Sequence, residues 1–207
     1  MLEQMEALDK SLTLAINGWG QMDSFWMFMS KTKVWIPLYL LIIALLIWKL
    51  GWKRGLVMVF FIALGCGLSD QLCNLVKNSA CRLRPSFDPE MLERGIKVLS
   101  MSSAKHCYGF YSAHSSSCFM LATGASLALR WGLMTPGTPG CEKTRHPKLH
   151  EVSFTVFMFV WAALVAFSRV FLAKHFLGDI TVGCFAGVIL AFLLCTVGKW
   201  ICRRFIR

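Results

Sequence analysis

Hydrophobic residues gather in long runs that polar segments separate. The runs cover approximately residues 34–50, 55–77, 112–134, 152–172 and 177–201. A helix needs about 20 apolar residues to cross the hydrocarbon core of a bilayer, so each run is long enough to cross it or nearly so. The pattern predicts an all-α polytopic membrane bundle of about five to six spans, formed as a single integral membrane domain over residues 1–207.

The first part of the chain, residues 1–33, has a different pattern and is predicted to be an N-terminal interfacial segment. Apolar residues recur at helical spacing and aromatic residues follow them, as in interfacial helices. These positions are Leu2, Met5, Leu8 and Leu12, then Trp19, Phe25, Trp26 and Phe28. The pattern leaves open whether residues 22–33 add a short membrane segment. The acidic first ten residues do not resemble a cleaved signal, so the segment is expected to remain in the mature protein.

Composition excludes several classes of protein. Hydrophobic residues make up 56% of the chain and charged residues 16%, whereas a soluble domain has about a quarter charged residues. A soluble enzyme, a disordered chain and a collagen-like fibre are therefore excluded. Lys and Arg total 22 against 11 Asp and Glu, which gives a net charge of +11. The basic residues lie between the apolar runs, so membrane lipids and an anionic lipid substrate, not nucleic acid, are the expected partners.

The nine cysteines favour neither a metal site nor a disulfide framework. Most lie inside apolar runs without metal-ligand spacing, where Cys behaves as a small hydrophobic residue. No metal and no cofactor are expected. Cys81 and Cys107 share the polar loop 78–111, and a disulfide between them is the less favoured alternative.

The order of the runs divides the polar segments between two sides of the membrane. If each run crosses once, one side holds 49–54, 130–151 with its Pro- and Gly-rich loop 135–150, and the tail after 198. Each side then has eleven basic residues, but Glu142 and Glu151 are the only acidic residues on this one. Three basic residues of the opposite side belong to a polar cluster. The positive-inside rule therefore favours a cytoplasmic location for this side and an outward-facing loop 78–111.

The polar cluster occupies the outward ends of four runs. Its members are Lys77 with Arg84-Pro85 after six intervening residues, Ser112-Ala113-His114, Ser168-Arg169, His175 after five more residues, and Asp179 after a further three. Lys77, Arg84 and Arg169 would repel a metal ion but suit a phosphate group. Ser112 begins a predicted helix, where its hydroxyl and the free N–H groups of Ala113 and His114 can bind the same anion.

The histidines of the cluster supply the reactive groups. His175 and Asp179 are four residues apart, so on a helix the carboxylate can hold one ring nitrogen and leave the other free to attack phosphorus. His114 comes from another run and can protonate the leaving oxygen. These residue types favour phosphoryl transfer through a phosphohistidine without a metal.

Taken together, these motifs resemble the three-part signature of the type 2 phosphatidic acid phosphatase superfamily, which is related to the vanadium haloperoxidases. The first and third parts fit the pattern, whereas Tyr111-Ser112-Ala113-His114 stands where the family usually has Pro-Ser-Gly-His. The resemblance implies a helical bundle with a haloperoxidase-like active-site core, His175 as nucleophile, Asp179 as its orienting partner and His114 as acid. It also implies a phosphate pocket formed by Lys77, Arg84, Ser112, Ala113, His114, Ser168 and Arg169.

Other polar residues have less specific interpretations. Asp70, Asn74 and Lys77 form a stripe that is expected to face the bundle, with neutralisation of Lys77 favoured over a direct role. The outer loop has five basic or titratable residues that could bind a second phosphate or a headgroup, or equally form a solvated surface: Arg82, Arg94, Lys97, Lys105 and His106. The tail is expected to anchor to anionic lipids through Lys199, Arg203, Arg204 and Arg207.

The resemblance favours a lipid phosphatase of a bacterial cytoplasmic (inner) membrane, with its active site facing the periplasm or the cell exterior. Undecaprenyl diphosphate, cleaved to undecaprenyl phosphate, is the favoured substrate. Lipid A comes next, followed by phosphatidylglycerophosphate and phosphatidic acid. More distant alternatives are a phosphotransferase that passes the group to a lipid hydroxyl and a non-catalytic membrane binding or transport protein.

Overall fold

The computed structural model describes residues 2–19, 22–101, 107–133 and 149–206. Its helices are α1 (Leu2–Asn17), α2 (Asp23–Met29), the 3-10 helix η1 (Thr32–Trp35), α3 (Ile36–Leu50), α4 (Trp52–Ala80), α5 (Pro89–Glu93), α6 (Ala113–Leu133), α7 (Leu149–Phe171) and α8 (Leu177–Phe205). Within the described ranges the only β-type pairing is an isolated bridge between Leu83 and Tyr108. The predicted all-α fold class is confirmed.

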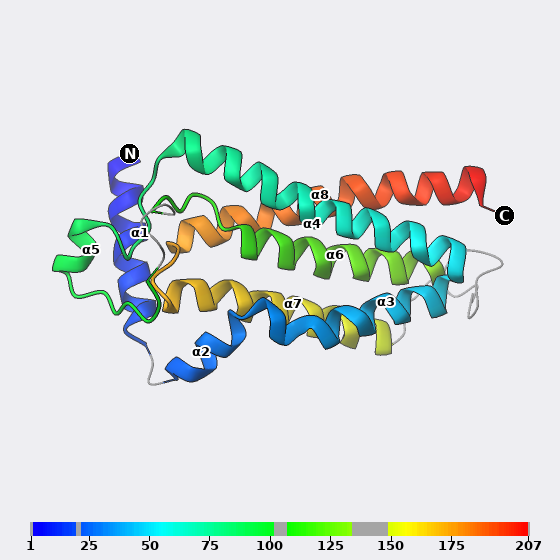
Figure 1. Ribbon diagram of the computed structural model, residues 1–207, viewed down its shortest axis with the longest axis horizontal. Coiled ribbons are helices and arrows are strands. Elements are labelled where there is room, and N and C mark those ends of the chain that lie inside the picture. Colours follow the sequence, from blue (N-terminus) through cyan, green and yellow to red (C-terminus); the bar gives the residue numbers. More distant parts are fainter. Residues whose placement is uncertain (1, 20–21, 102–106, 134–148, 207) are drawn as a thin grey trace.

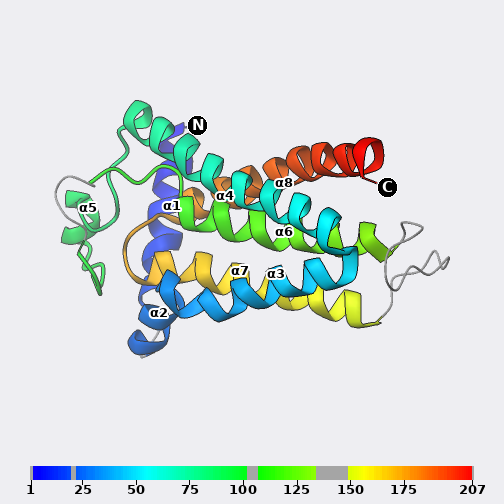
Figure 2. The ribbon, with the colours of Figure 1, turned by 45° about the vertical axis from the view of Figure 1, so that its right-hand side comes forward.

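The five long helices α3, α4, α6, α7 and α8 run side by side and form the bundle (Figures 1 and 2). They correspond to the five apolar runs of the sequence. Among the described residues, four candidate spans are long and apolar enough to cross a membrane: Thr32–Leu50, α4, α7 and α8. The fifth long helix, α6, packs against all four of the others. Because its neighbours shield it, α6 can carry a more polar sequence than a lipid-exposed span.

Helices α6 and α8 meet along a seam of small residues. A Cβ atom added at Gly187 would lie 2.1 Å from the Ser116 carbonyl oxygen, and one added at Gly183 would lie 2.7 Å from the Ser112 carbonyl oxygen. Glycine at these positions lets the two backbones approach closely. The seam therefore fixes the beginning of α8 against the beginning of α6.

The N-terminal helix α1 lies across one end of the bundle (Figure 1). Its polar residues Thr13 and Asn17 are buried, whereas Met5 and Leu8 are 62% and 58% exposed. The Asn17 Nδ2 group donates hydrogen bonds to the carbonyls of Val170 and Phe171, 3.2 Å and 3.1 Å away. Helix α1 thus binds the protein through Thr13 and Asn17 and through the partly buried Leu14 and Ile16. Met5 and Leu8 face the surroundings.

The next segment also stays at this end of the bundle. Helix α2 has seven residues and is too short to cross a bilayer. Its Trp26 ring stacks on Phe171 at the end of α7, with centroids 4.0 Å apart. Residues 22–33 therefore contribute α2 and the beginning of the first candidate span, and no additional span.

Candidate functional site

The predicted site residues lie at the end of the bundle where α4 and α7 finish and α6 and α8 begin. Lys77 is in the last turn of α4, Arg84 follows in the loop, Ser112, Ala113 and His114 stand at the start of α6, Ser168 and Arg169 end α7, His175 lies in the α7–α8 connection and Asp179 is in the first turn of α8. Segments that are far apart in the sequence are brought together here.

The connection between α7 and α8 positions His175. Ala173 adopts a left-handed conformation with φ of +53°, which turns the chain away from the helix axis. The Arg169 carbonyl then accepts hydrogen bonds from the N–H groups of Lys174 (2.9 Å) and His175 (3.3 Å). His175 is therefore tied to the last turn of α7.

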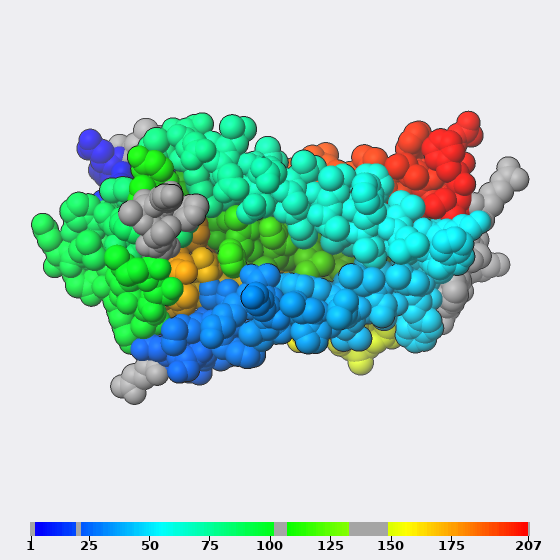
Figure 3. Space-filling view, in the orientation of Figure 1, coloured from blue at the N-terminus to red at the C-terminus, as the bar shows by residue number. Residues whose placement is uncertain are grey.

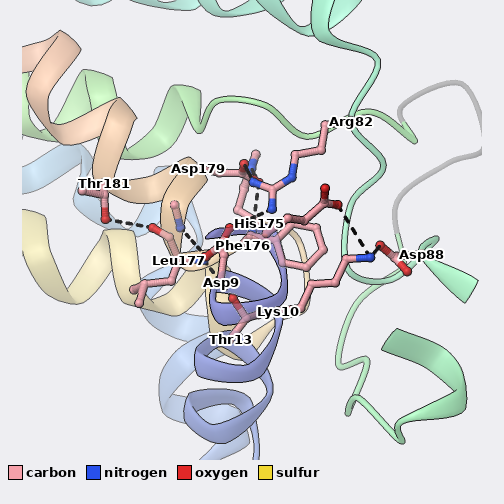
Figure 4. Close-up of polar contacts among 12 residues, drawn as sticks. Asp9, Lys10, Thr13, Arg82, Asp88, His175, Phe176, Leu177, Asp179 and Thr181 are labelled. Atoms are coloured by element: carbon pink, nitrogen blue, oxygen red, sulfur yellow. Dashed lines mark hydrogen bonds and ion pairs between the residues drawn. The ribbon is translucent and has the colours of Figure 1, made fainter. Parts of the chain in front are cut away.

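His175 and Asp179 face one another at the beginning of α8 (Figure 4). The His175 Nδ1 atom lies 3.6 Å from Asp179 Oδ2, and the side chains are 3% and 0% exposed. The Phe176 N–H group donates to the same Oδ2 at 2.9 Å, so the carboxylate also caps α8. In the described part of the chain, Nδ1 has no hydrogen-bond partner. With Nδ1 directed at the carboxylate, Nε2 is the nitrogen left for a ligand.

The electrostatic surroundings of His175 favour the neutral ring. Burial lowers its pKa well below the usual value, and the positive charges of Arg169, Arg84 and Lys77 lower it further. The Gly109 backbone acts in the opposite direction and raises the pKa of His175. The imidazole therefore stays neutral at neutral pH, because burial and the three nearby cations all disfavour a positive charge on the ring.

Arg84 is held by the loop that returns from α5 to α6. Its Nε group donates to the Tyr108 carbonyl at 3.0 Å, and its backbone N–H donates to the Cys107 carbonyl at 2.8 Å. A Cβ atom at Gly109 would lie 3.0 Å from Arg84 Cγ and 3.5 Å from Asp179 Oδ2. The small residue at 109 thus lets this loop lie close to both Arg84 and Asp179.

Ser112 links the beginnings of α6 and α8. It is fully buried, its N–H donates to the Asp179 carbonyl at 3.1 Å, and its Oγ accepts a long hydrogen bond from the Ser115 N–H at 3.4 Å. The preceding Tyr111 is buried, and its carbonyl accepts a hydrogen bond from the Cys73 thiol at 2.8 Å. The residue that departs from the family pattern before Ser112 is therefore packed against α4.

The next two residues of α6 border a cavity. Ala113 and His114 line a cavity of about 230 Å³, and Asp70 and Ser30 line it from other elements. A larger apolar cavity of about 330 Å³ continues between α3, α4 and α6, and Tyr39 lines both. Figure 3 shows α6 exposed in the depression between α3 and α4. The site therefore adjoins an apolar space inside the bundle.

Ser168 and Arg169 have different surroundings. The Ser168 hydroxyl is fully buried and donates to the Val165 carbonyl of its own helix at 2.6 Å. The Arg169 guanidinium is also buried and donates through Nη1 to the Ser30 hydroxyl. Its Nε group has no partner among the described residues. A buried guanidinium with a free donor is suited to an anionic ligand.

The structure adds residues that sequence reasoning missed. Lys174 precedes His175, and burial together with Arg169 and Arg84 lowers its pKa. Its position next to His175 in the sequence could have indicated that it lies near the site. Ser30 reaches Arg169 from the N-terminal segment, 139 residues away in the sequence, and nothing in the local pattern indicated it.

The basic outer loop is not simply solvated. Arg82 binds Asp179 and Asp9, Arg94 binds Glu90, and Lys97 binds Asp23. All three described basic residues that the sequence allowed to bind a second phosphate therefore pair with carboxylates instead. Lys105 and His106 lie outside the described residues.

The remaining predictions have mixed outcomes. The stripe of Asp70 and Asn74 was expected to face the bundle, but both side chains are exposed, so this prediction is wrong for them. Asp70 still lines the cavity beside His114, and its Oδ2 accepts a hydrogen bond from Asn74 Nδ2 at 3.4 Å. Cys81 and Cys107 are free thiols, so the alternative disulfide is not formed. The described ranges contain no group of three or more His, Cys, Asp or Glu residues able to hold a metal ion.

The sequence of the chain is similar to a known family and to individual proteins. The model of the PAP2 superfamily matches residues 54–202. The lipid A 4'-phosphatase of Bacteroides thetaiotaomicron is 28% identical over 194 residues, which cover 90% of this chain and 75% of that protein. The lipid A 4'-phosphatase of Porphyromonas gingivalis is 26% identical over 191 residues, covering 91% and 72%.

Two solved structures have a similar fold. A transmembrane PAP2-type phosphatidylglycerolphosphate phosphatase from Bacillus subtilis has a TM-score of 0.70 at 22% identity, covering 99% of this chain and 90% of that one. LpxE from Aquifex aeolicus has a TM-score of 0.62 at 19% identity, covering 90% and 93%. The family model spans most of the chain and all the motif residues, so the chain belongs to the PAP2 superfamily and is a multi-pass membrane phosphatase that acts on a lipid phosphate.

Proposed function

We propose that this membrane phosphatase removes a phosphate from lipid A, at the 4' position. The observation that carries the proposal is the similarity to two lipid A 4'-phosphatases along about nine-tenths of the chain. The sequence alone favoured undecaprenyl diphosphate and ranked lipid A second. The motif residues do not distinguish these substrates, because they address only the phosphate that both share. The two relatives therefore support lipid A over undecaprenyl diphosphate.

The lipid part of the substrate fits the apolar space beside the site. The larger cavity is lined by Ile42, Ile43, Leu46, Val59 and Ile62, among others, and is open towards the surface between α3 and α4. Acyl chains are excluded from water and favour such walls. A phosphate near His175 would thus stay connected to chains that remain in an apolar environment.

In the proposed mechanism, Lys77, Arg84 and Arg169 bind the phosphate oxygens. Their charges already act on His175, and the free Nε of Arg169 supplies a further donor. The first N–H groups of α6, at Ala113 and His114, add the positive end of a helix dipole. Ser112 and Ser168 complete the pocket, Ser168 by turning its hydroxyl away from the Val165 carbonyl.

Nucleophilic attack follows from the orientation of His175. The neutral ring presents Nε2 to phosphorus while Asp179 holds the Nδ1 side. A P–N bond forms as the P–O bond to the lipid breaks, and His114 gives its proton to the leaving oxygen. In the second step His114 takes a proton from water, the water oxygen attacks phosphorus, and the P–N bond breaks to release inorganic phosphate and restore Nε2. No step requires a metal.

Charge distribution supports an outward-facing site in a bacterial inner membrane. Both ends of the bundle hold basic residues, but at the His175 end most of the described ones belong to the proposed phosphate pocket or pair with carboxylates. The described basic residues of the opposite end remain to set the orientation by the positive-inside rule, among them Lys49, Lys53, Arg130, Arg203 and Arg204. Variants with a single cysteine test this orientation. An impermeant thiol reagent added to intact cells should label Cys81 and not Cys141, and the reverse pattern would contradict the outward-facing site.

The test of the substrate is phosphate release by the purified protein from matched panels of lipid A, undecaprenyl diphosphate and phosphatidylglycerophosphate in the same detergent. We expect kcat/KM for lipid A to exceed the others by tenfold or more, with His175→Ala inactive on each. A preference for undecaprenyl diphosphate would restore the order that the sequence favoured. Labelled phosphate recovered on an added lipid alcohol instead of in water would identify a phosphotransferase.

A further inference from the structure

The buried carboxylate of Asp179 uses its two oxygens differently (Figure 4). Oδ2 accepts from the Phe176 N–H and faces His175 Nδ1. Oδ1 accepts from Arg82 Nη1 at 2.8 Å. Arg82 therefore restrains the carboxylate from the side opposite to His175.

Arg82 is itself fixed on two further sides. Its Nη2 donates to Asp9 Oδ2 at 2.7 Å, and its guanidinium carbon lies 4.2 Å from the centre of the Phe176 ring. Burial opposes its charge, but Asp179 and Asp9 together raise the pKa of Arg82, so the guanidinium remains charged between two carboxylates. A planar group held in this way has little freedom to rotate.

Asp9 connects this group to helix α1 and to the beginning of α8. Its Oδ1 accepts from the Gly178 N–H at 2.7 Å, and the neighbouring Thr13 Oγ1 accepts from the Leu177 N–H at 3.0 Å. A Cβ atom at Gly178 would lie 2.8 Å from Asp9 Oδ2, so the contact depends on glycine. Helix α1 thus caps the helix that carries Asp179, although it is 169 residues away in the sequence.

We propose that Asp9 and Arg82 are positioning residues which hold Asp179 in the orientation that directs Nε2 of His175 towards phosphate. This inference rests on the proposed roles of His175 and Asp179. It assigns the outer-loop Arg82 to the orientation of the nucleophile instead of to a second phosphate. It also gives α1 a function in the reaction, although α1 supplies none of the proposed phosphate ligands.

The matched control is Lys10, which follows Asp9 on α1. Lys10 Nζ binds Asp88 at 3.0 Å and Glu90 at 2.7 Å, so it also fastens α1 to the rest of the protein. No described contact joins it to Asp179 or His175. Lys10→Gln therefore weakens the docking of α1 but leaves the contacts of Asp9 and Arg82 with Asp179 and α8 in place.

The experiment measures kcat, KM and thermal unfolding for Asp9→Asn, Arg82→Gln and Lys10→Gln in one detergent, with lipid A as substrate. Loss of the hydrogen-bond partner behind a metal ligand typically costs about 10- to 100-fold in activity, and Arg82 holds the equivalent place behind Asp179. We expect Arg82→Gln to lose kcat in this range, with KM little changed. Asp9→Asn, one contact further from Asp179, should lose less kcat than Arg82→Gln but more than Lys10→Gln, also with KM little changed. Lys10→Gln should keep kcat within about twofold, although its Tm falls by an amount comparable to that of Asp9→Asn.

A second measurement does not depend on the stability of these variants. Arg82→Ala should regain kcat when methylguanidinium is added, whereas Lys10→Ala should not respond. Equal kcat losses in the Asp9 and Lys10 variants, or no response of Arg82→Ala to methylguanidinium, would overturn the proposal that Asp9 and Arg82 position Asp179. His175→Ala, measured in parallel, separates the two proposals: if it retains activity, the proposed mechanism itself fails.

Discussion

The two ends of the bundle both carry basic side chains, but they hold them in opposite ways. At the His175 end, the buried Arg169 donates to the Ser30 hydroxyl and keeps an Nε group without a partner among the described residues. At the far end, Lys49 lies beside the Trp48 ring, 4.2 Å from its centre, and Arg204 is exposed. The first arrangement is typical of an anion site, whereas the second is typical of anchors at a membrane interface. Position and partners, not the number of charges, distinguish the two ends.

The largest effect should come from removing an arginine charge at the His175 end, compared with the same substitution at the far end. Arg169→Gln removes a buried guanidinium proposed to bind the phosphate, and loss of such a group costs about 100- to 1,000-fold in kcat. Arg204→Gln removes an exposed charge and should leave kcat within about twofold. Steady-state phosphate release by protein that elutes normally on size exclusion checks both. Similar losses in the two variants would show that the ends do not differ as described.

The next effect concerns the seam that fixes α8 against α6. Gly187→Ala places a Cβ against the Ser116 carbonyl, and such overpacking costs about 1 to 3 kcal/mol. Gly67→Ala, in α4, has no heavy atom within 4 Å of the new Cβ and should be neutral or stabilising by up to about 1 kcal/mol. Thermal unfolding in detergent compares them. An unchanged Tm for Gly187→Ala would mean that the seam is looser than the contacts indicate.

The smallest effect is the pH dependence of stability that comes from His175. The folded protein lowers the pKa of His175 below the value of about 6.5 in the unfolded chain, so below that pH only the unfolded chain takes up this proton. Stability should therefore fall as the pH drops below 6.5 towards the folded pKa. We expect Tm to fall more steeply between pH 7.5 and 5 for the wild type than for His175→Gln. Parallel slopes would contradict a buried neutral His175.

The parts of the fold that depend on local pattern could be predicted from the sequence. The apolar runs became the five long helices because a bilayer requires apolar residues over the whole length of a span. The proximity of His175 and Asp179 was also predicted, from helical spacing. In the structure, however, His175 precedes α8, and the α7–α8 connection brings its Nδ1 atom to 3.6 Å from Asp179 Oδ2.

The contacts that sequence reasoning missed join residues far apart in the chain. Asp9 meets Arg82 across 73 residues, and Ser30 meets Arg169 across 139. In the sequence, Arg82 is one of several basic residues in a polar loop, and a solvated loop would have the same composition. Only the placement of α1 across the bundle end distinguishes the two cases.

The central claim is that His175 is the nucleophile, and trapping the covalent intermediate tests it most directly. Purified protein is mixed with lipid A, quenched within one turnover and digested for mass spectrometry. We predict one phosphoryl group on the peptide that contains His175, and neither that modification nor phosphate release in His175→Ala. A phosphoryl group on another residue, or phosphate release by His175→Ala at the wild-type rate, would contradict the account.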